Sequence, residues 1–78
     1  MHFYFVEKEK KSLKPGDGSL YLEEASNKNS WCIRDLLGEY TLYFSMYYEA
    51  KLLFDKVDSL AKLKEYWGII SDLIRNPN

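Results

Sequence analysis

Two residues of this chain could take part directly in nucleophilic or acid–base chemistry, His2 and Cys32. His2 is the only histidine and lies beside the N-terminus, where chains are commonly poorly ordered. Cys32 is the only cysteine; it lies between Trp31 and Ile33, with no further histidine in the chain to activate its thiolate. We therefore expect Cys32 to be a small buried hydrophobic residue, and we expect the protein not to be an enzyme.

Metal-binding chemistry is not indicated either. Soft metal ions take several cysteine or histidine ligands, and this chain has one of each. Close carboxylate pairs could hold a hard cation, but such pairs are more typical of a solvated surface. The pairs are Glu23 with Glu24, Asp35 with Glu39, and Asp55 with Asp58. We expect no metal ion and no cofactor.

The unusual feature of the sequence is its aromatic density between residues 40 and 48, which read YTLYFSMYY. If this segment and the residues that follow it form a helix, its apolar side chains spread over an arc of about 240°. One hairpin and one helix cannot cover such an arc, so part of it should form an interface or an exposed rim. Tyrosine and methionine are enriched at protein interfaces. The predicted protein interface has tyrosine anchors and an acidic rim: Tyr40, Tyr43, Tyr47 and Tyr48, with Glu39, Glu49 and Asp55.

A second candidate surface lies near the N-terminus, where Phe3, Tyr4 and Phe5 are followed by several lysines. Aromatic side chains beside lysines are one way to hold single-stranded nucleic acid. Glu7 and Glu9 nearly cancel this positive charge, and no known nucleic-acid-binding signature is present. The lysines of this alternative site are Lys8, Lys10, Lys11 and Lys14.

Composition indicates one folded domain over residues 1–78, because the chain is short, 46% hydrophobic and 29% charged. A net charge of −1 selects no class of partner. The single cysteine excludes an internal disulfide, which favours a reducing compartment such as the cytoplasm. The longest stretch without charge, residues 40–48, is far shorter than the roughly 20 residues of a membrane-spanning helix.

The elements that must position these residues begin with a β-hairpin. Residues 2–7 and 20–24 have strand-forming composition, and residues 12–19 contain Pro15, Gly16 and Gly18, which favour a chain reversal. Polar residues 25–30 then indicate a loop that ends in a helix N-cap at Asn29 or Ser30.

Two helices are predicted after this loop. Apolar residues recur at steps of three and four from residue 33 to 57, although residues 39–45 also alternate as a strand would. Asp58 and Ser59 offer the next N-cap. The final helix should end by Asn76, because Pro77 disfavours helical geometry before it. Its apolar stripe consists of Leu60, Leu63, Trp67, Ile70 and Ile74.

These elements make an α+β fold of two strands and two helices, ββαα, in which the hairpin packs on the final helix. The alternative has a third strand at residues 39–45 and one long C-terminal helix. We expect a complete short gene product that binds and inhibits, or adapts, a larger protein; its Lys-, Asn- and Tyr-rich composition is typical of phage or mobile-element proteins directed at a host enzyme. The alternatives are a structural homodimer formed through the aromatic surface and binding of single-stranded nucleic acid.

Overall fold

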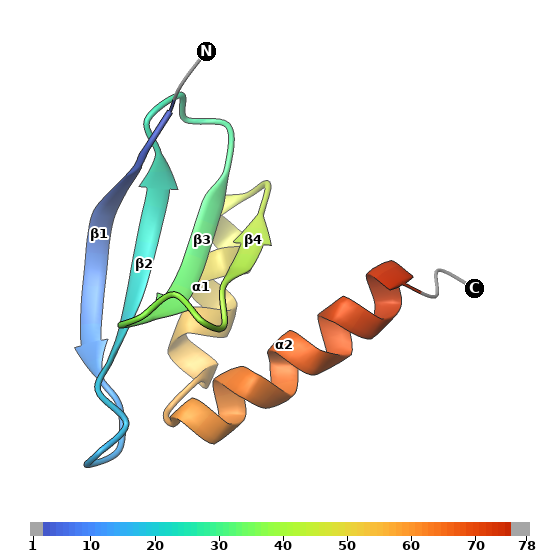
Figure 1. The fold of residues 1–78 in the computed structure, drawn as a ribbon. Helices are drawn as coiled ribbons and strands as arrows, with labels where there is room; N and C mark the ends of the chain where they lie inside the picture. Colours follow the sequence, from blue (N-terminus) through green and yellow to red (C-terminus); the bar gives the residue numbers. More distant parts are fainter. Residues whose placement is uncertain (1–2, 76–78) are drawn as a thin grey trace.

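A four-stranded antiparallel sheet followed by two helices forms the fold of the computed structural model (Figure 1). The structure describes the backbone of residues 3–75 and the side chains of residues 3–70. This architecture confirms the predicted α+β class. His2 and Pro77, which were singled out in the sequence, lie outside the described residues. The elements are β1 (Phe5–Ser12), β2 (Ser19–Ala25), β3 (Trp31–Asp35), β4 (Leu42–Phe44), α1 (Tyr47–Lys56) and α2 (Leu60–Arg75). The strands lie in the sheet in the order of the sequence.

The N-terminal hairpin is confirmed, with β1 and β2 paired from Phe5 opposite Ala25 to Ser12 opposite Ser19, although the first strand extends to Ser12 and does not end at residue 7 as predicted. Its turn depends on two glycines, since Gly16 and Gly18 have φ of 89° and 80°, which L-residues rarely adopt. A backbone hydrogen bond of 2.9 Å from the N–H of Leu13 to the carbonyl of Gly18 closes this turn.

The helix predicted from residue 33 is wrong over its first part, because residues 31–35 form β3 and the helix begins only at Tyr47. The predicted N-cap at Asn29 or Ser30 is also wrong. The carbonyl of Ser30 instead accepts a hydrogen bond of 2.9 Å from the N–H of Ala25 and so closes the β2–β3 hairpin. The physical reason is that β3 gives β2 a second hydrogen-bonded neighbour, which a helix at these residues could not do.

Residues 39–45 follow the strand alternative in part, since Leu42–Phe44 form β4 beside β3. The β3–β4 connection turns at Gly38, which has φ of 71°. The Asp35 carboxylate holds this turn by accepting a hydrogen bond of 3.0 Å from the N–H of Tyr40. The alternative is wrong in its single long helix, because residues 57–59 separate α1 from α2.

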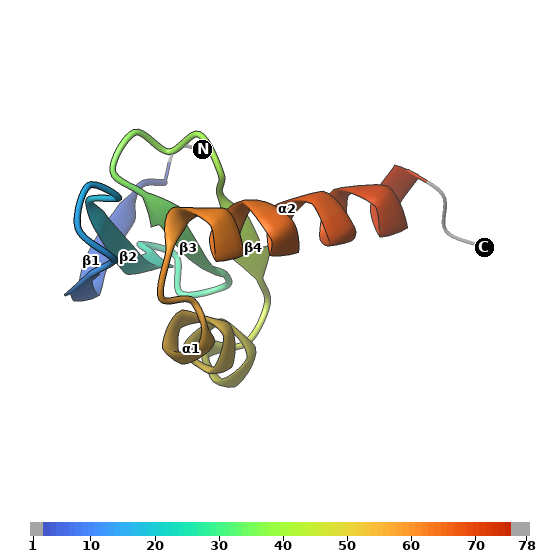
Figure 2. The same ribbon diagram turned by 90° about the horizontal axis from the view of Figure 1, so that it is seen from below.

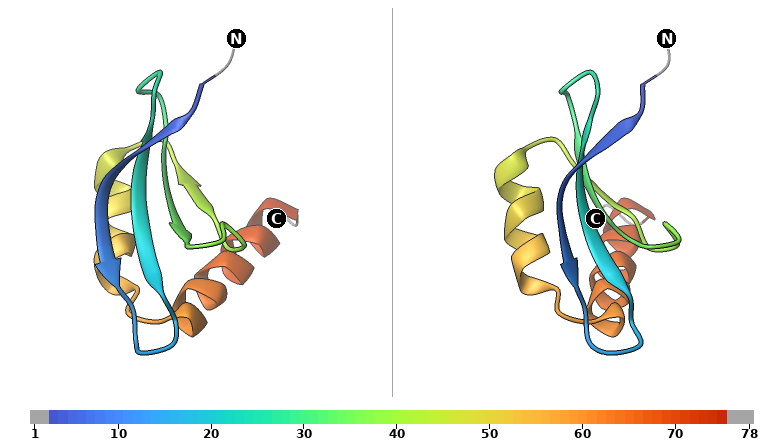
Figure 3. Two further views of the ribbon diagram at one scale, coloured as in Figure 1. Left: turned by 60° about the vertical axis from the view of Figure 1, so that its left-hand side comes forward. Right: turned by 90° about the vertical axis from the view of Figure 1, so that its left-hand side faces the viewer.

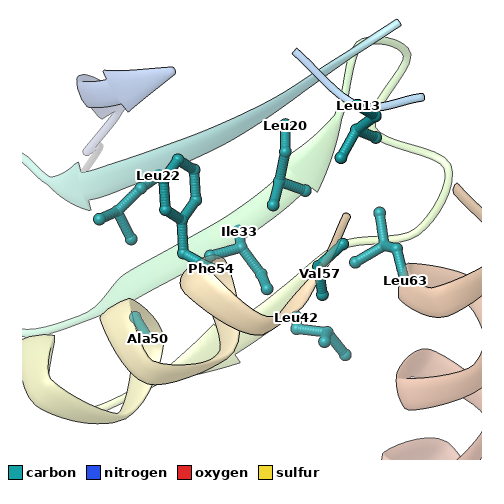
Figure 4. Close-up of a cluster of buried hydrophobic side chains, with 9 residues drawn as sticks. All are labelled: Leu13, Leu20, Leu22, Ile33, Leu42, Ala50, Phe54, Val57 and Leu63. Atoms are coloured by element: carbon teal, nitrogen blue, oxygen red, sulfur yellow. The ribbon is translucent and has the colours of Figure 1, made fainter. Parts of the chain in front are cut away.

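The core lies between α1 and one face of the sheet (Figure 4). Strand positions that alternate along β2, β3 and β4 point their side chains at α1, as the period of a strand requires. Leu13 and Leu63 close one end of this layer, so the start of α2 belongs to the core as well. The buried cluster consists of Leu13, Leu20, Leu22, Ile33, Leu42, Ala50, Phe54, Val57 and Leu63.

The second helix is anchored at its N-terminus and then extends past β4 (Figure 2). Ser59 is its N-cap, because the Ser59 hydroxyl accepts a hydrogen bond of 3.2 Å from the N–H of Lys62. The Asp17 carboxylate, from the β1–β2 turn, accepts a further bond of 2.9 Å from the N–H of Leu60. The predicted stripe packs on the core as far as Ile70, and the side chain of Ile74 lies outside the described residues.

We predict that Asp17→Ala destabilises the fold by about 1 kcal/mol, because a backbone N–H of the first turn of α2 loses its acceptor. Urea unfolding followed by circular dichroism measures this loss. Asp58→Ala is the matched control, since the Asp58 side chain is exposed at the same helix start. Equal destabilisation by the two substitutions would contradict the anchoring role of Asp17.

Candidate functional site

The structure divides the predicted tyrosine interface among three places. Tyr40 is half-buried, and its ring contacts the ring of Trp67 with centroids 5.5 Å apart. Tyr43 is 67% exposed and lies on the face of the sheet opposite α1. Tyr47 and Tyr48 lie on α1. The division follows from the corrected fold, because residues 40–44 are loop and strand and do not continue the helical face.

A shallow hollow on α1 brings together part of the predicted site. Its volume is about 260 Å³, and its lining residues recur along one side of the helix. Tyr48 is 69% exposed and Leu52 is 44% exposed, so both offer apolar surface to a partner. We call this surface the α1 hollow; it consists of Tyr47, Tyr48, Lys51, Leu52 and Asp55.

Ion pairs hold one wall of the α1 hollow in place. The Lys51 ammonium lies 2.7 Å from Oε1 of Glu9 on β1 and 3.1 Å from Oδ1 of Asp55. Hydrogen bonds to these two carboxylates raise the pKa of Lys51 above its ordinary value. The Tyr47 hydroxyl also donates to Glu9, at 3.5 Å, and the Tyr47 ring contacts the ring of Trp31 at 4.8 Å. The contacts fix Tyr47 and Lys51 against the sheet.

One acidic residue, Asp55, lines the α1 hollow. Glu49 and Asp55 are exposed, and Lys51 is already paired with two carboxylates. Of the predicted rim residues, Glu39 lies apart, exposed in the β3–β4 connection. Lys51, Leu52 and Glu9 were not among the predicted site residues. The spacing of four between Lys51 and Asp55 was available as a signal, whereas the contact with Glu9 depends on the tertiary fold.

The face of the sheet opposite α1 has no helix over β1 and β2 (Figure 3). Its centre is a partly buried ion pair, in which the Arg34 guanidinium donates two bonds to Glu23, at 2.9 and 3.1 Å. These hydrogen bonds raise the pKa of Arg34. The same guanidinium donates to the carbonyls of Asp35 and Leu36, so its donors are used within the protein. We interpret this group as structural, because its guanidinium makes four hydrogen bonds within the protein and partly buried charges need such partners.

Long side chains cover this face in place of a helix. Tyr21 lies between Lys10 and Arg34, whose charged groups are 5.6 and 4.5 Å from its ring centroid. Phe5 and Tyr43 have ring centroids 6.0 Å apart, and their strand partners are the small residues Ala25 and Cys32. Ala25 and Cys32 are accordingly buried.

The lysines of the predicted nucleic-acid site do not share one surface. Lys10 lies over Tyr21 on the helix-free face, while Lys11 lies over Phe54 on the α1 face. Lys8 is 3.7 Å from Glu24, and Lys14 is exposed in the β1–β2 turn. Their charges therefore form no continuous stripe on one face.

Within residues 3–70, no group of three or more His, Cys, Asp or Glu side chains is placed to hold a metal ion. Neither of the two described helices combines the length and apolar character that crossing a membrane requires. No family model, curated protein or solved structure matches the chain.

Cys32 is predicted to react slowly with thiol reagents. Burial, together with the charge of Glu23, raises the pKa of its thiol to about 12 from the usual 9.0. At pH 7 the reactive thiolate is then about a thousandfold scarcer in the folded protein than in the unfolded chain. Labelling rates measured with and without urea test this difference, and native labelling within about tenfold of the unfolded rate would contradict it.

The raised pKa of the Cys32 thiol also predicts that the stability of the fold depends on pH. Because the folded thiol holds its proton more tightly than the unfolded one, the contribution of Cys32 is intact below about pH 9 and is lost as the pH rises toward 12. Cys32→Ala should therefore flatten the decrease in unfolding free energy between these values. An unchanged pH profile in the variant would contradict the shift.

Proposed function

We propose that this chain is a non-enzymatic protein-binding module, an inhibitor or adaptor, whose α1 hollow receives a side chain of a larger protein. The observation that supports the proposal is the exposure of Tyr48 and Leu52, one helical turn apart, in a hollow whose other wall is fixed to the sheet. Exposed aromatic and aliphatic side chains around a concave centre are typical of protein-binding surfaces.

The size of the α1 hollow favours a protein partner over a small molecule. Small-molecule sites commonly enclose about 300–1,000 Å³ and bury most of the ligand. The hollow has about 260 Å³ and lies on the outer surface of one helix. One side chain of a partner would fill it, and the surrounding contacts would come from the partner's surface.

The charge around the hollow indicates a basic partner surface. Asp55 is exposed in its lining, Glu49 is exposed elsewhere on α1, and Glu9 lies behind Lys51. An arginine of the partner could place its guanidinium over the Tyr48 ring and pair with Asp55. Such an arrangement would be weakened by salt, because the charges are near the surface.

The chain contains a matched pair of tyrosines for testing this proposal. Tyr48 is 69% exposed on α1 and Tyr43 is 67% exposed on the helix-free face. We predict that Tyr48→Ala weakens binding to the partner by about 30-fold or more, as for an interface anchor, and that Tyr43→Ala changes it by less than about threefold. The partner is first captured from a lysate of cells that express the chain, and the affinities are then measured by calorimetry.

Urea unfolding is the control for correct folding. Substitutions of exposed side chains should change the free energy of unfolding by about 0.5 kcal/mol or less. Leu52→Ala should weaken binding together with Tyr48→Ala, because the two side chains share the hollow. Equal losses from Tyr43→Ala and Tyr48→Ala, or a loss only from Tyr43→Ala, would contradict the proposal and place binding elsewhere.

A further inference from the structure

The first strand has an unpaired edge. The sheet order places β1 at its border, so one row of β1 backbone N–H and C=O groups faces away from β2 (Figure 1). Within residues 3–75, no other strand pairs with this edge. Charges and bulges on an edge strand commonly prevent the addition of a further strand, so pairing at β1 requires an alignment that matches its charges and accommodates its bulge.

A β-bulge at Lys8 changes which β1 side chains share a face. Pairing with β2 places Phe5, Glu7 and Lys10 on the helix-free face, and it places Glu9 and Lys11 on the α1 face. The register shifts between Glu7 and Glu9, so the alternation of side chains moves by one residue at this point. Residues 7 and 10 consequently point to the same side, although a regular strand would place them on opposite sides.

We propose that the β1 edge pairs with β1 of a second copy of this chain, in antiparallel orientation about a twofold axis between residues 8 and 9. In this register Glu7 lies opposite Lys10, and Lys8 lies opposite Glu9, with each pair occurring twice by symmetry. Opposite charges directly across antiparallel strands are stabilising. The regular segments on the two sides of the bulge, residues 5–7 and 10–12, then face each other.

The side-chain faces support this register as well as the charges do. Glu7 and Lys10 both lie on the helix-free face, and Val6 and its opposite residue Lys11 both lie on the α1 face. A shift of one residue would place Glu7 opposite Glu9 or Lys8 opposite Lys10, which brings like charges together. The bulge and the charge order therefore select the same alignment.

The outer charge pair of this contact is the one that is exposed and available, because Glu9 of the inner pair already binds Lys51. Glu7 and Lys10 are both exposed, and within residues 3–70 neither has an ion-pair partner. Two edge strands bury a small area, so we expect a weak dimer with a dissociation constant on the order of 10–100 µM. The contact is on a different element from the α1 hollow, and a partner could bind there in either oligomeric state.

Charge exchange at Glu7 and Lys10 tests the proposal directly by sedimentation velocity between about 5 and 500 µM. Glu7→Lys places Lys opposite Lys, and Lys10→Glu places Glu opposite Glu, so each variant alone should self-associate at least about tenfold more weakly than the natural chain. An equimolar mixture of the two variants restores opposite charges at both positions. It should form a heterodimer with an affinity within about threefold of the natural dimer.

Recovery in the mixture would show that both variants are folded and that the charges meet across the twofold axis. A natural chain that stays monomeric at about 500 µM would overturn the proposal, as would variants that dimerise normally or a mixture that stays monomeric. Tyr48→Ala is the control for the other surface and should leave the dimer unchanged. A dimer lost in Tyr48→Ala but retained in Glu7→Lys would assign self-association to the α1 hollow.

Discussion

The packing of α1 against one face of the sheet is the contact on which the rest of the molecule depends. Ala50, Phe54 and Val57 are buried against strand residues that include Leu22 and Ile33. Complete burial of a side chain such as Phe54 or Val57 contributes about 1.5–3 kcal/mol, so this layer is a main source of stability for so short a chain. A single helix of ten residues can bury only one of its sides in the core. Its other side, with Tyr48 and Leu52, remains at the surface.

The same constraint explains the helix-free face. With no helix to cover Tyr21, Ala25 and Cys32, the sheet uses the long side chains of neighbouring strands. The Glu23–Arg34 pair fits this arrangement, because its guanidinium is hydrogen-bonded to a carboxylate and to backbone carbonyls. Replacing one partner of such a pair leaves an uncompensated charge, which is why we regard it as structural and not as a ligand site.

Local sequence signals predicted the two ends of the fold well. The Pro-Gly-Asp-Gly turn determines the first hairpin because its glycines accept positive φ, and Ser59 marks the start of α2 because its hydroxyl caps the helix. The middle of the chain was harder. Ile33, Leu36 and Leu37 have helical spacing, but Ile33 is a buried strand residue and the two leucines are exposed in a turn. Residues 31–35 form a strand and not a helix because β3 pairs with β2. This pairing is a tertiary contact, so no local sequence pattern reveals it.

The candidate site was predictable to the extent that it lies on one helix. Tyr47, Tyr48 and Asp55 were identified by residue type, whereas Tyr40 and Tyr43 were assigned to the same surface because the helix was placed too early. The ion pair between Lys51 and Glu9 joins α1 to β1, so it could be identified only from the folded structure.

Photo-crosslinking can show whether a partner binds the outer side of α1, as we propose. A benzophenone amino acid is placed at position 48 in one preparation and at position 43 in another, since both tyrosines are similarly exposed on different surfaces. We expect a covalent product with the captured partner from position 48 and none from position 43. Crosslinking from position 43 alone would contradict it and would place the partner on the helix-free face of the sheet.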